Sequence, residues 1–148
     1  MNSRPQLLLD AGALISAESH PHGKVIAECQ LALLARRPAL LPAVVFAQVW
    51  RASPRQHALS RLRQMCRAIP FTTKTADDVG RLLARSGTSD VVDAAVIVAA
   101  IEHNAAVLTS DPKDLAKLAS AAEHPVRLLT VRPERLSGSA VTSSATFS

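Results

Sequence analysis

The chain has 148 residues, 48% of them apolar and 20% charged, which is the balance of a globular protein with room for one core. No uncharged apolar stretch reaches the ~20 residues of a membrane span, and Asp10 interrupts the run 7–15 that could otherwise pass for a signal-peptide core. Cys29 and Cys66 are isolated and lack CxxC spacing, which argues against a zinc site or a disulfide framework. We therefore expect a cytoplasmic protein without a membrane segment, with both cysteines as small core residues.

The net charge of +5 is unevenly distributed along the chain. No Asp or Glu occurs between Glu28 and Asp77, and the other acids fall largely within 77–114. This acid-free window holds Arg36, Arg37, Arg51, Arg55, Arg61, Arg63, Arg67 and Lys74. Any single arginine could lie on a solvated helix face, but eight cations without a counter-charge favour a polyanionic partner. Since the aromatic residues are one Trp and three Phe, we expect arginine contacts to a backbone rather than base stacking.

Short apolar runs alternate with helical patterns along the chain. The runs predicted as strands are 6–10, 39–41, 68–71, 105–109 and 126–131. The first helix is predicted to start at 13–17. The other helices are predicted to cover 24–37, 42–51, 53–67, 75–85, 90–103 and 111–122. This alternation predicts an α/β domain over residues 1–136 with a mainly parallel central sheet. Residues 137–148 are small and polar, and we expect them to form a disordered tail.

Four aspartates stand where strands end and where one helix begins. Asp10 follows the first predicted strand, and Asp111 follows the fourth within two residues. Asp90 and Asp93 are one helical turn apart at the head of the long apolar helix. Because ligands of parallel sheets lie beyond the carboxyl ends of the strands, the four carboxylates are expected to converge there. Packed carboxylates recruit a hard cation such as Mg²⁺ or Mn²⁺, and a metal-activated water can attack a phosphodiester.

Each of these acids also has a purely structural explanation. Asp10 and Asp111 could be turn residues or helix caps, since Asp is favoured at both kinds of position. Asp90 could be an N-cap, with Asp93 as its partner in a capping pair. Asp93, however, precedes the apolar run AAVIVAAI, and an acid at the head of a buried helix needs a partner, which favours the site.

The order of these motifs resembles the PIN-domain family. LLLDAGALIS (7–16) is similar to the opening strand and turn of PIN domains, and LPAVVFAQVWR (41–51) to a segment in their middle. SDVVDAAVIVAAIEHNAAVLTSDPKDL (89–115) resembles their second half, with an Asp-Ala helix start, a strand and Thr-x-Asp. The likeness spans roughly residues 7–131. Within the family it is closest to the VapC-type toxins of type II toxin–antitoxin systems.

The resemblance implies a three-layer α/β/α fold and an Mg²⁺- or Mn²⁺-dependent endoribonuclease, with tRNA or rRNA as substrate. It also implies a homodimer inhibited by a cognate VapB-like antitoxin. Asp10, Asp93 and Asp111 match the family's catalytic and metal-binding acids. Asp90 matches an additional metal ligand, and Thr109 a threonine that supports the pocket through hydrogen bonds.

The chain departs from the family pattern at one position. Gln48 stands where many PIN domains carry Glu, so its amide could hold a metal-bound water but adds no negative charge. A weakened or altered site is one consequence of this exchange. For RNA binding, we expect contacts from the arginines that cluster on or beside two consecutive helices. They are Arg51, Arg55, Arg61 and Arg63.

One alternative stays open from the sequence, and two others are disfavoured by specific residues. The first is a catalytically weak or inactive PIN module that binds nucleic acid or antitoxin, as Gln48 would allow. The second is a phosphoacceptor signalling domain, but Asp10 is followed by Ala-Gly rather than a second acid, and the last strand leads to Arg132 and Pro133 rather than a lysine. The third is a haloacid-dehalogenase-like phosphatase, which needs an acid at position 12, where this chain has Gly12.

Overall fold

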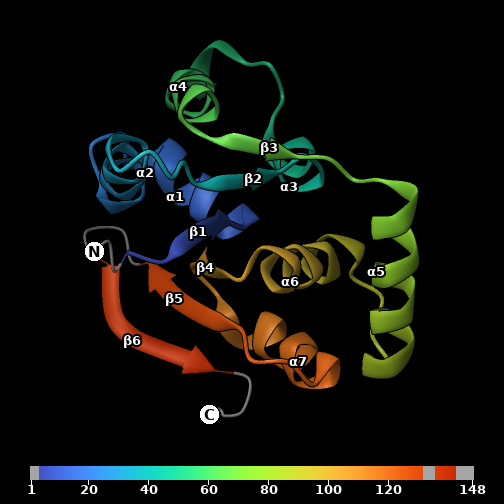
Figure 1. Ribbon diagram of the computed structural model, residues 1–148. Helices are drawn as coiled ribbons and strands as arrows, with labels where there is room; N and C mark the ends of the chain where they lie inside the picture. Colours follow the sequence, from blue (N-terminus) through green and yellow to red (C-terminus); the bar gives the residue numbers. More distant parts are fainter. Residues whose placement is uncertain (1–3, 132–135, 143–148) are drawn as a thin grey trace.

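A six-stranded sheet with the order β3-β2-β1-β4-β5-β6 forms the centre of the computed structural model (Figure 1), which describes residues 4–131 and, for the backbone, 136–142. The first five strands pair in parallel, and β6 pairs antiparallel with β5. The strands are β1 Gln6–Leu9, β2 Leu40–Pro42, β3 Arg67–Ile69, β4 Ala105–Thr109, β5 Arg127–Val131 and β6 Leu136–Thr142. The predicted mainly parallel α/β architecture is confirmed.

Helices cover both faces of the sheet, which gives three layers (Figure 1). The helices α1, α2 and α4 pack together on one face, α6 and α7 on the other, and α5 lies outside α6 and α7. The short α3 follows β2 and contacts α1, α6 and β2, so it joins the two helical layers. The helices are α1 Ala11–Ser19, α2 Lys24–Leu34, α3 Ala43–Val49, α4 His57–Met65, α5 Thr73–Ser86, α6 Val91–His103 and α7 Pro112–Ala122, with a 3-10 turn η1 Pro54–Gln56.

The core lies where the central strands meet both helical layers. Leu8, Leu9 and Leu108 in β1 and β4 are fully buried, because both faces of these strands are covered. The helix α6 is buried along most of its length since it lies between the sheet and α5, which explains why its sequence is apolar on all sides. Cys29 is buried, Cys66 is partly buried, and both are free thiols, as predicted. No helix in the described part of the chain combines the length and apolarity that crossing a bilayer requires.

The structure differs from the sequence prediction at three places. The helix α2 ends at Leu34 rather than at position 37, and Arg36 lies in the left-handed region with φ 60°. The single helix predicted for 53–67 is divided into η1, whose N-cap is Ser53, and α4. The prediction of a disordered tail from position 137 is wrong for 137–142, because these residues form part of β6, which pairs with the edge of β5. A strand needs only backbone pairing there, so small polar side chains do not prevent it. Residues 143–148 lie outside the described residues.

Leu8 of the central strand provides a test of the core. Replacing the fully buried Leu8 with Ala leaves a cavity between two covered faces, and we expect Leu8→Ala to lower the free energy of unfolding by about 2–5 kcal/mol. Leu34→Ala on α2 is the matched control, because Leu34 is 80% exposed and its truncation should change stability by less than about 0.5 kcal/mol. Urea unfolding measures both variants. Equal effects would contradict the position of β1 at the centre of the core.

Candidate functional site

Asp10 is a buried carboxylate at the carboxyl end of β1. Only 7% of the residue is exposed, and its backbone N–H donates to the carbonyl of Leu108 over 3.2 Å. Its Oδ1 accepts the N–H of Ala13 over 2.9 Å, which makes Asp10 the N-cap of α1. Burial raises the pKa of Asp10 above its usual value, while hydrogen bonds from Thr109 and from backbone N–H groups oppose that rise.

Thr109 connects Asp10 to Asp111 on the neighbouring strand. The Thr109 side chain is fully buried at the end of β4 and hydrogen-bonds the Asp10 carboxylate. Its Oγ1 also accepts the backbone N–H of Asp111 over 3.1 Å. Asp111 is exposed and caps α7, since its Oδ1 accepts the N–H of Lys113 over 3.4 Å. One hydroxyl therefore fixes two of the predicted site acids at adjacent strand ends.

The turns that follow β1 and β4 also touch each other. A Cβ added to Gly12 would collide with the Ser110 hydroxyl and would lie 3.1 Å from the Ser110 backbone nitrogen. Glycine at position 12 therefore accommodates this close approach without displacing Ser110. Gly12 and Ser110 were not among the site residues predicted from the sequence. The signal that could have found this contact is a glycine two residues after the acid that ends the first strand.

Asp90 and Asp93 stand at the head of α6. Asp90 is exposed and is the N-cap, with its Oδ1 accepting the N–H of Asp93 over 2.9 Å. Asp93 is partly buried, and its pKa rises to about 6. Burial is the largest cause, followed by repulsion from Asp90 and then from Asp10, Asp114 and Asp111. The Asp93 carboxyl group therefore lies within electrostatic range of four other acids at one edge of the sheet.

Asp114 is an acid of this edge that sequence analysis missed. It stands in the first turn of α7 and lines a hollow of about 270 Å³ together with Asp90 and Asp93. Thr88, Ser89, Lys117 and Leu118 complete that hollow. The available signal was the spacing of Asp111 and Asp114, which repeats the three-residue spacing of Asp90 and Asp93 at a helix start.

The structure does not bring all predicted ligands into direct contact. Within residues 4–131 and 136–142, no three His, Cys, Asp or Glu side chains lie close enough to hold one metal ion together. Gln48 is exposed near the end of α3, and no hydrogen bond of its side chain is found among those residues. The donor chemistry nevertheless fits a hard cation, because the ionisable groups that share this edge and perturb Asp93 are all carboxylates.

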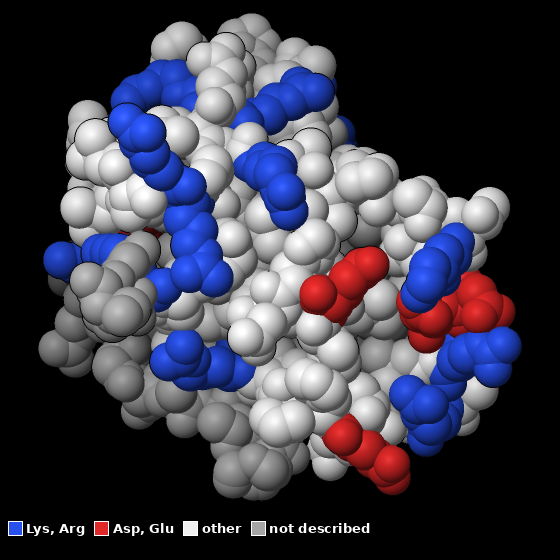
Figure 2. Space-filling view, in the orientation of Figure 1, with Lys and Arg blue, Asp and Glu red and all other residues white. Residues whose placement is uncertain are grey.

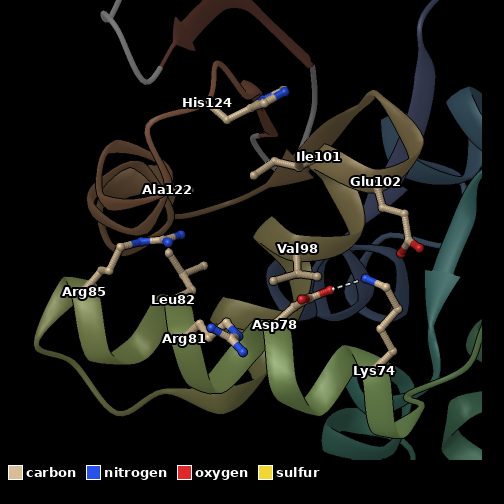
Figure 3. Close-up of a pocket in the computed structure, with 10 residues that line it drawn as sticks. All are labelled: Lys74, Asp78, Arg81, Leu82, Arg85, Val98, Ile101, Glu102, Ala122 and His124. Carbon is tan, nitrogen blue, oxygen red and sulfur yellow. Dashed lines mark hydrogen bonds and ion pairs between the residues drawn. The ribbon is translucent and has the colours of Figure 1, made fainter.

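A hollow larger than the one beside the acids lies elsewhere, between α5, α6 and α7 (Figure 3). Its volume is about 420 Å³, and it contains none of the predicted site residues. Figure 3 shows Lys74 paired with Asp78 on one side, with a Nζ–Oδ2 distance of 2.9 Å, and Arg85 on the other side near Ala122. Size therefore does not identify the candidate site, and the acids at the strand ends do.

The four arginines predicted for RNA binding are exposed around α3 and α4, and two of them already have partners within the chain. Arg51 donates from Nη1 to the carbonyl of Trp50 over 2.7 Å and to that of Ala47 over 3.2 Å. The Arg63 guanidinium lies over the Phe46 ring, 4.6 Å from its centroid. On one face of the molecule, Lys and Arg gather where Figure 1 places α2, β2 and α4, whereas over α5, α6 and α7 Asp and Glu lie beside further Lys and Arg (Figure 2).

A family model described as PIN domain matches residues 7–121, which include β1, β4 and every acid of the edge. The chain belongs to the PIN domain family. PIN domains are generally nucleases, which agrees with an acidic edge beside basic surface. No curated protein sequence matches the chain.

Several solved structures share this fold at low sequence identity. VapBC2 from Rickettsia felis, bound to a DNA fragment from its promoter, is 18% identical with a TM-score of 0.59, and the match covers 73% of this chain and 89% of the other. A toxin–antitoxin complex from Klebsiella pneumoniae is 23% identical with a TM-score of 0.55, covering 75% and 91%. A Pyrobaculum aerophilum protein is 15% identical with a TM-score of 0.52, covering 79% of each chain.

The raised pKa of Asp93 predicts how stability changes with pH. Because the folded pKa of about 6 exceeds the usual 3.8, raising the pH through this interval ionises the unfolded chain first and lowers the stability of the native state. Asp93→Asn removes that cost, which corresponds to at most about 3 kcal/mol, reduced by solvent screening at this partly exposed group to about 1–2 kcal/mol.

Thermal unfolding without metal measures this effect. The stability gain of Asp93→Asn should be absent near pH 3.5, grow between pH 4 and 6, and stay constant at higher pH. A gain that is independent of pH would show that the acids do not repel Asp93.

Proposed function

We propose that this PIN domain is a metal-dependent endoribonuclease and the toxin component of a VapBC-like toxin–antitoxin pair. The observation that carries the proposal is the raised pKa of Asp93, which results from burial and from four other acids at the same edge of the sheet. Such an arrangement costs stability unless a cation neutralises it. An ordinary set of helix caps does not require a carboxyl group with a perturbed pKa.

Asp10, Asp90, Asp93 and Asp111 are the residues that would hold Mg²⁺ or Mn²⁺, with Asp10, Asp93 and Asp111 as the catalytic acids. The bound ion would supply a Lewis acid that polarises a phosphoryl oxygen and acidifies water for phosphodiester hydrolysis. Thr109 holds Asp10 and Asp111 in place through its hydroxyl. Asp114 is a further carboxylate of the same hollow as Asp90 and Asp93.

The helix termini support phosphate binding at this edge. Asp10, Asp90 and Asp111 are the N-caps of α1, α6 and α7, so three helices of nine or more residues begin there. Their N-terminal dipoles favour negative charge, both of the carboxylates and of a phosphate group. The chain can therefore hold an anionic substrate beside its acids.

RNA and a protein partner complete the proposal. The exposed arginines around α3 and α4, among them Arg55 and Arg61, support contact with the RNA backbone. Exposed apolar side chains on α1 and α2, such as Ile15 at 54% and Leu34 at 80%, support an antitoxin or a second copy as partner. We expect a cytoplasmic homodimer that a VapB-like antitoxin inhibits, with tRNA or rRNA as substrate.

A catalytically inactive binding module is the second candidate. It is favoured by Gln48 and by the finding that no three acids among the described residues stand within reach of one ion. Such a module would bind RNA or antitoxin without cleaving.

Cleavage of RNA by the purified chain distinguishes the two candidates. With Mg²⁺ or Mn²⁺, Asp93→Asn and Asp111→Asn should reduce cleavage at least about 100-fold, because each removes one charge from the proposed ligand set. Asp77→Asn on α5 is the matched control, since Asp77 is exposed and pairs with Arg81 outside the site. Undiminished cleavage in excess EDTA, or wild-type cleavage by Asp93→Asn, would refute the metal-dependent nuclease. RNA binding without cleavage under every metal condition would favour the inactive module.

Gln48 is expected to modulate the metal affinity rather than to determine it. Gln48→Glu adds one negative charge, and it should lower the metal concentration for half-maximal cleavage by about threefold to tenfold if Gln48 reaches the ion. Asp90→Asn should raise that concentration, and by less in the Gln48→Glu background, because groups acting on one ion are not additive. Gln64→Glu on α4 is the matched control for added charge. Strictly additive effects would mean that Gln48 and Asp90 act on different ions, with Asp90 a helix cap alone.

A further inference from the structure

Arginines stand at or just before the first residue of four of the five parallel strands. Arg67 is the first residue of β3, and Arg127 is the first residue of β5. Arg37 lies three residues before β2, and Arg4 lies two residues before β1. Because parallel strands all begin at one edge of a sheet, these four arginines lie along the edge opposite to the acids. We call Arg4, Arg37, Arg67 and Arg127 the amino-edge row.

The arginines of this row differ in solvent exposure and in their hydrogen bonds and ion pairs within the chain. Arg37, Arg67 and Arg127 are exposed. Arg37 donates from Nε to Oε1 of Gln6 over 3.4 Å and from Nη1 to the carbonyl of Arg4 over 3.5 Å, so its guanidinium is held at the junction of β1 and β2. Arg4 is engaged with Glu28 at 3.2 Å. The exposed positive charge of the row therefore rests on Arg37, Arg67 and Arg127.

Two hollows are found along the same edge, each with one arginine of the row. Arg67 lines one hollow of about 290 Å³, and Glu102 and His103 at the end of α6 line the same hollow. Arg127 lines another of about 370 Å³ beside Asn104 and Pro125. The surface around the row is thus concave in two places, and Glu102 is the acid that shares a hollow with it.

The length of the row and its distance from the acids limit the size and shape of a ligand that it can bind. From β3 to β5 there are four strand spacings, so the row extends over about 19 Å. Along that length a nucleic-acid duplex presents on the order of ten phosphate charges. The strands between the row and the acids have three to five residues, which separates the two edges by about 10–16 Å. An arginine of the row therefore cannot contact the phosphate at the acids, and a shared ligand must extend past both edges.

We propose that the amino-edge row is a second polyanion site that binds the phosphate backbone of a double-helical part of the RNA, outside the cleaved segment. This inference rests on the proposed function, which makes RNA the substrate. Arginines without an aromatic residue in the row fit contacts to phosphates rather than to bases. A double helix presents its phosphates outward along its length, so several of them can face a row that extends over about 19 Å.

The test is binding of a fluorescent RNA duplex of about 20 base pairs in EDTA, so that no cleavage interferes. The double variant Arg67→Gln/Arg127→Gln should bind about tenfold more weakly or worse at 0.1 M salt, with a salt slope lower by about two. Arg81→Gln/Arg85→Gln on α5 is the matched control, with the same loss of charge, and should bind like the wild type. Circular dichroism and thermal unfolding verify that both variants fold, as expected for exposed side chains.

Two outcomes would overturn the proposal: wild-type affinity and slope in the row variant, or an equal loss in the α5 control. Cleavage of a dinucleotide RNA, whose single phosphodiester cannot reach both edges, tests the nuclease separately. It should be unchanged in the row variant, so failure of the row and failure of the proposed function remain distinguishable.

Discussion

The buried Asp10 carboxylate is the constraint on which the geometry of the acidic edge depends. A carboxylate that is 7% exposed must receive hydrogen bonds to remain in the structure, and here they come from Ala13, Gly12 and Thr109. Thr109 belongs to the adjacent strand β4. Its hydrogen bond to Asp10 therefore also fixes the end of β1 next to the end of β4. The close approach of Gly12 and Ser110 follows from the same register. Asp10 and Asp111 are thus positioned by hydrogen bonds at the ends of the two central strands.

Capping explains how this edge tolerates so much negative charge. Asp10, Asp90 and Asp111 each accept a backbone N–H at the start of a helix, which satisfies donors that the helix itself leaves unpaired. The structural explanation of these residues and the functional one are therefore compatible. Asp93 is the exception, because it caps nothing in the described structure and its pKa is raised by burial first and then by the neighbouring acids. Its position is the part of the edge that helix formation does not explain.

The sequence predicts those features that depend on local pattern. Buried strands were visible as apolar runs, and the acids after β1 and β4 could be placed at one edge because parallel strands end together. Asp114 and the contact of Gly12 with Ser110 depend on how separate turns approach in space, which periodicity does not encode. The same applies to Cys29 of α2 and Cys66 just after α4, which lie close enough that Cys66 raises the pKa of the Cys29 thiol. For β6, composition indicated disorder because pairing on an open sheet edge is a backbone property and leaves little trace in side chains.

Opposite charges at the two edges of the sheet make the domain electrically polar along its strands. The helix dipoles oppose this polarity, because their positive ends lie among the acids, but side-chain charges extend further into solvent. A molecule of this kind experiences a torque in the electric field of a polyanion. It therefore turns its arginine-bearing edge toward the polyanion before the two make contact. Productive encounter then requires a second reorientation, or a ligand that curves around the domain. For the proposed nuclease, the rate of association and the rate of cleavage should therefore respond differently to ionic strength, since only the first depends on this long-range alignment.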